Sequence, residues 1–228
     1  MSPRRVPVSR RERPAKPALS REGVVQAALG IMRAEGLEKV TMRRLANELD
    51  TGPASLYVYV HNTAELHGAL LDELLSDVVP PEPGTEWRAG VVGQLTQYTR
   101  ILIGQPSLAR SVLTLRPSGP NYVRLIDTLL GLLREGGVPL RQAAWGVDLL
   151  LQLATATAAE QGTRDQAGEA DKADREVNLQ AMAVREASAE EYPEIVRARD
   201  ELFSGDGEQR GRWAFAALLD GIASVPAH

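Results

Sequence analysis

Several side chains between residues 41 and 60, TMRRLANELDTGPASLYVYV, are of types that bind the edges of bases. Arg43 can make a bidentate contact with guanine, and Ser55 can donate to or accept from several bases. Ala54 and Val58 offer only apolar contacts, which suit thymine methyl groups. This chemistry requires an element narrow enough to enter a major groove.

The spacing of apolar residues predicts two short helices that present these side chains. Met42, Leu45, Ala46 and Leu49 form one stripe at the helical period, and residues 50–53, DTGP, then break the pattern. A second helix is expected from Ala54 to Val60. It is only about two turns long, so tertiary packing must hold it.

Leu56 and Val60 lie on one side of this second helix and can close over the first helix. The opposite side carries Ala54 and Val58, bordered by Ser55 and Tyr57. That arrangement is typical of a recognition helix. An ordinary helical hairpin fits the same twenty residues.

Composition excludes several other classes of protein. The 228 residues include no cysteine, so disulfides, thiolate metal sites and cysteine nucleophiles are impossible. No run of about 18 uncharged apolar residues is present, and the N-terminus lacks the apolar centre of a signal peptide. We therefore expect a cytoplasmic protein that does not associate with membranes. No metal or cofactor is expected, because the sequence has no metal-ligand cluster or phosphate-binding loop.

Charge is distributed unevenly along the chain. The net charge is −4, but residues 1–18 alone carry +5, so the remainder carries −9. Four prolines indicate that this basic arm is extended and largely disordered when free. A basic arm beside an acidic body suggests a polyanion bound at one end; a solubilising tail is the alternative.

Every periodic segment of the chain is helical, which predicts an all-α fold. After a first helix at 21–35 and the helix capped by Thr41, a helix capped by Asn62 continues to about residue 79. Prolines 80, 81 and 83 mark a domain boundary. Further helices are expected at 86–105, 107–115, 121–135, 139–160, 176–187, 193–203 and 208–223, with a mobile loop at 161–175.

Two of these helices are apolar around most of their circumference. They carry the runs from Trp145 to Ala154 and from Trp213 to Leu219. A helix of this kind is buried on both sides. Two such helices from each of two chains would form a four-helix interface about a two-fold axis; burial within a single chain is the alternative.

The stretch from about Leu19 to Leu71 resembles the DNA-binding domain of the tetracycline-repressor (TetR) family of bacterial regulators. The matching pattern is Thr41-x-x-x-Leu45-Ala46-x-x-Leu49, then SLYxYVxN from Ser55 to Asn62, then Glu65-Leu66. The part LYVYVHN is similar to the tetracycline repressors themselves. In the C-terminal half, Tyr192-Pro193 and the final WAFAALLDGI are similar to late-helix patterns of the family.

This resemblance implies a homodimeric repressor that binds a palindromic operator and releases it when a small effector binds. Its expected domains are a basic arm (1–18), a three-helix helix-turn-helix domain (19–79) and a helical ligand-binding and dimerisation domain (86–228). Thr41, Tyr57 and Tyr59 match positions that hold the DNA backbone, and Arg43 matches one that can read a base. The expected DNA-binding residues are Thr41, Arg43, Arg44, Pro53, Ala54, Ser55, Tyr57, Val58, Tyr59 and His61.

Three residues depart from the family pattern. Asp50 stands where the turn usually has glycine and Thr51 where valine is common, so we expect a less tightly wound turn. Thr63 replaces a lysine that often contacts phosphate. The basic arm is expected to supply some of that charge.

The C-terminal residues predict two further surfaces. An apolar effector cavity is expected to be lined by Tyr98, Leu102, Leu113, Tyr122, Ile126, Trp145, Leu149 and Gln152. The dimer interface is expected to contain Leu150, Leu151, Ala154, Trp213, Ala216, Ala217 and Asp220. Ordinary core packing is the alternative for each cavity residue. A dimeric DNA-binding protein without an effector and, more remotely, a helical enzyme are the competing functions.

Overall fold

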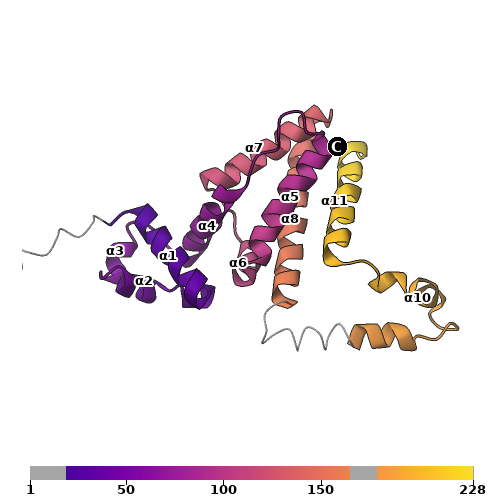
Figure 1. Ribbon diagram of the computed structural model, residues 1–228, viewed down its shortest axis with the longest axis horizontal. Helices are drawn as coiled ribbons and strands as arrows, with labels where there is room; N and C mark the ends of the chain where they lie inside the picture. The colour runs from indigo at the N-terminus through magenta and orange to yellow at the C-terminus, as the bar shows by residue number, and fades with distance from the viewer. Residues whose placement is uncertain (1–18, 165–178, 228) are drawn as a thin grey trace, which may run out of the picture.

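Helices make up the regular structure of the chain (Figure 1). The computed structural model describes residues 19–164 and 179–227. No strand occurs in these ranges, and the all-helical prediction is confirmed. The elements are α1 (Arg21–Glu35), η2 (Leu37–Lys39), α2 (Met42–Glu48), α3 (Pro53–Leu56), α4 (Thr63–Leu74), η3 (Leu75–Asp77), α5 (Trp87–Ile103), α6 (Pro106–Val112), α7 (Pro120–Glu135), α8 (Leu140–Arg164), α10 (Pro193–Ala198), η4 (Glu201–Phe203) and α11 (Gly207–Ser224).

Local capping fixes the first helix where the sequence predicts it. The Ser20 Oγ atom accepts a hydrogen bond from the Gly23 amide at 3.0 Å, and α1 ends at Glu35 before the C-cap Gly36, whose φ of 92° suits glycine. Val24, Ala28 and Leu29 are among the side chains that α1 buries. The helix is thereby anchored at both ends and along one face.

The turn after α2 is wound as tightly as a glycine-containing turn, contrary to our expectation. Asp50 adopts a φ of 47°, in the left-handed region. The Thr51 amide donates to the Ala46 carbonyl at 2.9 Å, and the Asp50 amide donates to the Asn47 carbonyl at 3.2 Å. These two bonds form a Schellman motif. Aspartate tolerates this conformation better than most residues, so the turn survives without glycine.

The helix α3 is shorter than expected. It ends at Leu56 rather than at Val60, and the chain continues as a turn in which the amides of Tyr59 and Val60 both donate to the Leu56 carbonyl. Leu56 and Val60 are each 0% exposed. Burial of these two side chains therefore holds the segment, as expected for a helix too short to be stable alone.

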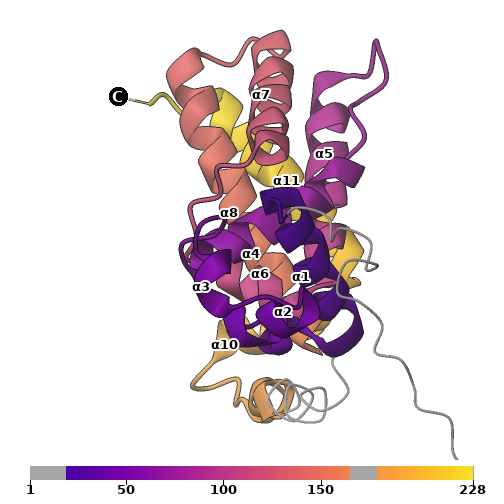
Figure 2. The same cartoon turned by 90° about the vertical axis from the view of Figure 1, so that its left-hand side faces the viewer.

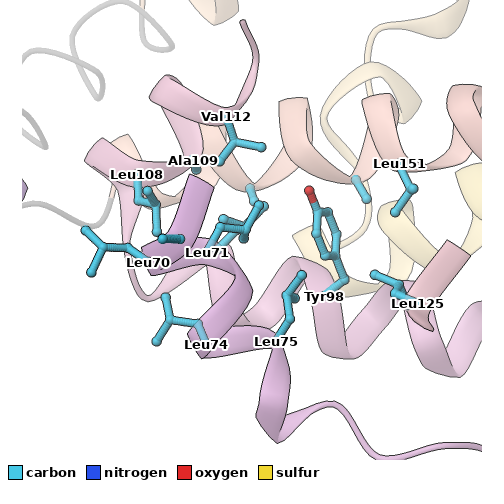
Figure 3. Packing of buried hydrophobic residues seen from close by; sticks show 14 of the residues in the cluster. Leu70, Leu71, Leu74, Leu75, Tyr98, Leu108, Ala109, Val112, Leu125 and Leu151 are labelled. Carbon is cyan, nitrogen blue, oxygen red and sulfur yellow. The ribbon is translucent and has the colours of Figure 1, made fainter. Parts of the chain in front are cut away.

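The helix α4 joins the N-terminal helices to the C-terminal bundle. Asn62 caps it by accepting from the Glu65 amide at 2.8 Å. Its second half enters the C-terminal core, where its leucines lie beside α6 and Tyr98 (Figure 3). One apolar core therefore runs through both parts, and we keep the boundary near residue 80 as a proposal.

The C-terminal bundle is built around α8, which contacts α5, α6, α7 and α11. In Figures 1 and 2, α1 to α3 group at one end of the molecule, with α5, α7, α8 and α11 beyond them. The helix α11 runs antiparallel to α8, because Gln142 near the start of α8 donates to the carbonyls of Ile222 and Val225. No helix in the described ranges is long and apolar enough to span a membrane.

Several boundaries differ from expectation. The helix α8 continues to Arg164, so the expected loop at 161–175 is helical in its first four residues. The helix expected at 193–203 is divided into α10 and η4, and the helix expected at 176–187 is described only from residue 179. The basic arm (1–18) and the rest of the expected loop lie outside the described residues.

Candidate nucleic-acid interface and regulatory core

The surface of α3 and the turn after it presents the expected plain side chains to solvent. Pro53, Ala54 and Ser55 are exposed, and Tyr57 and Val58 are 49% and 74% exposed. Tyr59 is half-buried and packs on the core. The structure thus brings the expected α3 residues onto one accessible element.

The two arginines of α2 differ in their environments. Arg43 is exposed. Arg44 is bound to two carboxylates, with its Nη2 atom 2.6 Å from Glu35 Oε1 and its Nη1 atom 2.7 Å from Glu48 Oε2. The hydrogen bond from Arg44 lowers the pKa of Glu35. Arg44 therefore ties α2 to the end of α1, whereas Arg43 is presented outward.

Thr41 and His61 flank the α2–α3 unit. The Thr41 Oγ1 atom accepts from the Arg44 amide at 3.1 Å, which caps α2 and leaves the hydroxyl hydrogen able to donate. The His61 side chain is 78% exposed, and its Nδ1 atom lies 2.8 Å from Glu65 Oε2. The same carboxylate accepts from the His61 amide, and this bond lowers the pKa of Glu65.

The residues expected to line an effector cavity lie in two different environments. Tyr98, labelled in Figure 3, and Leu102 are fully buried. Tyr122 and Ile126 are half-buried against the same core. The Tyr98 hydroxyl lies 2.8 Å from Thr155 Oγ1 and donates to it, because that hydroxyl itself donates to the Leu151 carbonyl. Burial raises the pKa of Tyr98 above its usual value. The remaining four, Leu113, Trp145, Leu149 and Gln152, are exposed.

The residues expected at a dimer interface also divide in two. Leu150, Leu151 and Ala154 are 0–5% exposed and pack inside the bundle, so in this conformation they cannot reach a second chain. Trp213 is 74% exposed, and Ala216, Ala217 and Asp220 are exposed beside it on α11. On α8, the exposed large apolar side chains include Leu140 and also Trp145 and Leu149, which we had expected in the cavity.

A set of polar contacts between α4 and the C-terminal bundle was not expected from the sequence. Asp72, 9% exposed, accepts from the Tyr122 amide at 2.9 Å, and His67 Nδ1 lies 2.7 Å from Ser111 Oγ. Asp72 also lines a cleft of about 750 Å³ between α1, α4 and the α6–α7 loop. The sequence contained one local sign of the Asp72 contact. The helix α7 begins with Gly119-Pro120, which provides no side-chain cap of its own.

The partly buried imidazole of His67 predicts a pH dependence of stability. Burial lowers the pKa of His67, so protonation favours the unfolded chain, whose histidine titrates near pH 6.5. Its contribution to the free energy of unfolding should fall as the pH drops below about 6.5 and level off below the folded pKa. Urea unfolding of the wild type and His67→Asn at several pH values measures this; the difference between their curves should change with pH. Parallel curves would contradict it.

Known proteins resemble this chain in both sequence and fold. The family model for the "Tetracyclin repressor-like, C-terminal domain" matches residues 80–225. The class D tetracycline repressor of Escherichia coli is 27% identical over 212 residues, which cover 91% of this chain and 87% of that protein.

Two solved structures extend the similarity to the fold. A Streptomyces protein named as a transcription regulator, SCO7704, is 50% identical, with a TM-score of 0.79 over 93% of this chain and 98% of that one. ActR of Streptomyces coelicolor, solved in complex with actinorhodin, is 33% identical, with a TM-score of 0.77 over 90% of this chain and 96% of that one.

Proposed function

This chain belongs to the TetR family of transcriptional regulators, and from that premise we propose that it is a repressor that binds a palindromic operator as a homodimer. A small, mostly apolar effector would release it from DNA. The observation that carries this proposal is the exposed, four-residue helix α3, which the buried Leu56 holds to the domain core. Arg43 of the preceding helix α2 is also exposed. TetR-family regulators are DNA-binding transcription factors rather than enzymes.

Few side chains of the proposed reading surface can discriminate between bases. Ala54 and Val58 suit thymine methyl groups, and Ser55 can donate a hydrogen bond to, or accept one from, several bases. Of these four side chains, Arg43 alone can form a bidentate contact with guanine. Thr41, Tyr57 and Tyr59 are proposed to hold the DNA backbone. Arg44, because its guanidinium is bound by Glu35 and Glu48, is proposed to position α2 rather than to contact DNA.

Arg43→Ala is expected to weaken binding by about 1–3 kcal/mol for each half-site and to relax the preference for guanine at one position of each half-site. Arg43→Lys is the matched control, since it keeps the charge and loses the planar fork. It should restore affinity for DNA in general without restoring the guanine preference. Fluorescence anisotropy with duplexes altered at single positions measures both effects. A variant that keeps the wild-type preference would contradict the role of Arg43.

The proposed dimer interface combines exposed side chains of two adjacent helices. Trp145 and Leu149 of α8 are 60% and 45% exposed, and Trp213 of α11 is 74% exposed. Large apolar side chains exposed on neighbouring helices favour an interaction site there. The proposed interface therefore keeps the α11 residues of our expectation and replaces the buried α8 residues with these exposed ones.

The effector site is proposed to lie around Tyr98, Leu102, Tyr122 and Ile126. The solved complex of ActR with actinorhodin supports this proposal, because a chain similar to this one binds an organic molecule. Such a ligand would have to open the closed core and break the pair of Tyr98 with Thr155. That closed core also favours the alternative of a DNA-binding dimer without an effector. Actinorhodin, used as a probe, discriminates between the two if it releases the protein from DNA.

Sedimentation of the full chain, alone and with duplex DNA, tests the proposal as a whole. We expect two chains per particle in the absence of DNA and two chains per bound site. A monomer that binds each site as a single chain would contradict it.

A further inference from the structure

A carboxylate of α4 caps the first turn of α7. This turn has no local cap, because its N-cap residue is Gly119 and its first residue, Pro120, has no amide hydrogen. The Tyr122 amide instead donates to Asp72 Oδ1 at 2.9 Å. The Asn121 side-chain amide donates to the Asp72 carbonyl at 2.9 Å and to its Oδ2 atom at 3.3 Å. Both carboxylate oxygens and the backbone of one α4 residue thus bind the start of α7.

The fit at this position is close. A Cβ atom placed on Gly119 would lie 2.1 Å from Asp72 Cγ, so a side chain there would displace the carboxylate. A negative charge at the N-terminus of the 16-residue α7 also interacts favourably with the helix dipole. The absence of a side chain at residue 119 is therefore what admits Asp72.

Leucines at the end of α4 and in η3 also make an apolar contact with the bundle. Leu70, Leu71, Leu74 and Leu75 lie in the core beside α6 and Tyr98 (Figure 3). Apolar contacts are not directional, so they constrain the angle of α4 less than hydrogen bonds do. The hydrogen bonds of Asp72 are directional and fix one angle between α4 and α7.

We propose that Asp72 is a positioning residue: by capping α7, it fixes the orientation of the DNA-binding domain relative to the C-terminal bundle. The inference rests on the proposed function, in which the spacing of two DNA-binding domains decides affinity for a palindrome. It adds a residue that holds each domain at its angle, beside the contact of His67 with Ser111. A cap that merely stabilised α7 would leave that orientation unchanged.

Two variants disrupt the contact from opposite sides. Asp72→Ala removes the acceptor, and Gly119→Ala displaces it. Their matched controls are Asp77→Ala, which removes an exposed carboxylate from η3, and Gly131→Ala, since a Cβ on this α7 glycine meets nothing within 4 Å. Circular dichroism and amide exchange in α1 and α5 verify that each variant is folded.

The orientation can be measured without DNA and without an identified effector. The chain has no cysteine, so Asn47→Cys on α2 and Asp127→Cys on α7, both exposed positions, can carry a pair of spin labels. Dilution with unlabelled chain leaves only the distance within one chain. We expect a narrow distance distribution in the wild type and both controls, and a distribution about twice as broad in Asp72→Ala and Gly119→Ala. Unchanged distributions in these two variants would overturn the proposal.

Amide exchange and DNA binding complete the test. The Tyr122 amide should exchange about tenfold faster in Asp72→Ala, as expected for loss of a cap. Affinity for a palindromic duplex should fall about tenfold, whereas affinity for a single half-site should not change. An equal loss on both duplexes would overturn the positioning role, because it indicates a damaged DNA-binding domain. A wild type without preference for the palindrome would refute the proposed function, while the label distances still decide whether Asp72 fixes the domain angle.

Discussion

Leu56→Ala is expected to abolish specific DNA binding while the C-terminal bundle stays folded. Leu56 is 0% exposed and is the buried side chain of the four-residue α3. Truncating a buried leucine costs about 2–5 kcal/mol. Because so short a helix has little stability of its own, this loss should free α3 from the domain. Specific binding, measured by anisotropy, should disappear, and amide exchange should accelerate in α2 and α3 but not in α5 or α8.

Val58→Ala is the matched control for this prediction. Val58 lies two residues further along and is 74% exposed, so its truncation should change stability by no more than about 0.5 kcal/mol. It should affect binding only through a lost contact with DNA. If Leu56→Ala bound the operator as well as Val58→Ala does, α3 would not be the reading element.

Trp213→Glu is expected to separate the proposed dimer into monomers. Trp213 is 74% exposed in a single chain, so the substitution should not disturb the fold. In an interface about a two-fold axis, it places a carboxylate from each chain in an apolar environment. An unpaired buried charge costs about 3 kcal/mol or more, which corresponds to more than a hundredfold loss of dimer affinity. Sedimentation equilibrium measures the dissociation constant, and binding to a palindrome should weaken in parallel.

Val123→Glu provides the comparison, since Val123 is a 54% exposed apolar residue on α7, outside the proposed interface. It should sediment like the wild type. A dimeric Trp213→Glu variant, or a monomeric Val123→Glu variant, would place the interface elsewhere.

The sequence predicted local features well because their causes are local. Ser20, Thr41 and Asn62 cap the helices that they were expected to cap, since each needs only an amide two or three residues away. The helix at 21–35 was predicted to the residue. The turn at Asp50 was not, because aspartate here adopts the left-handed conformation that we had associated with glycine.

The orientation of α8 could not be read from its sequence. When the sequence of a helix is apolar on most sides, it indicates that the helix is enclosed. It does not indicate which side faces the helix's own bundle. Leu150 and Leu151 were therefore expected at the surface and are buried, whereas Trp145 and Leu149 were expected inside and are exposed. Asp72 was missed because its partners on α7 lie about fifty residues away.

Selection of bound sequences from a pool of random duplexes tests the central claim most directly. The proposed homodimer with two α3 elements predicts a palindromic site whose half-sites are centred about 34 Å apart or a multiple of this distance. It also predicts that the Arg43→Ala pool loses one guanine from each half-site. Recovery of no shared sequence, or of single half-sites without symmetry, would contradict the account.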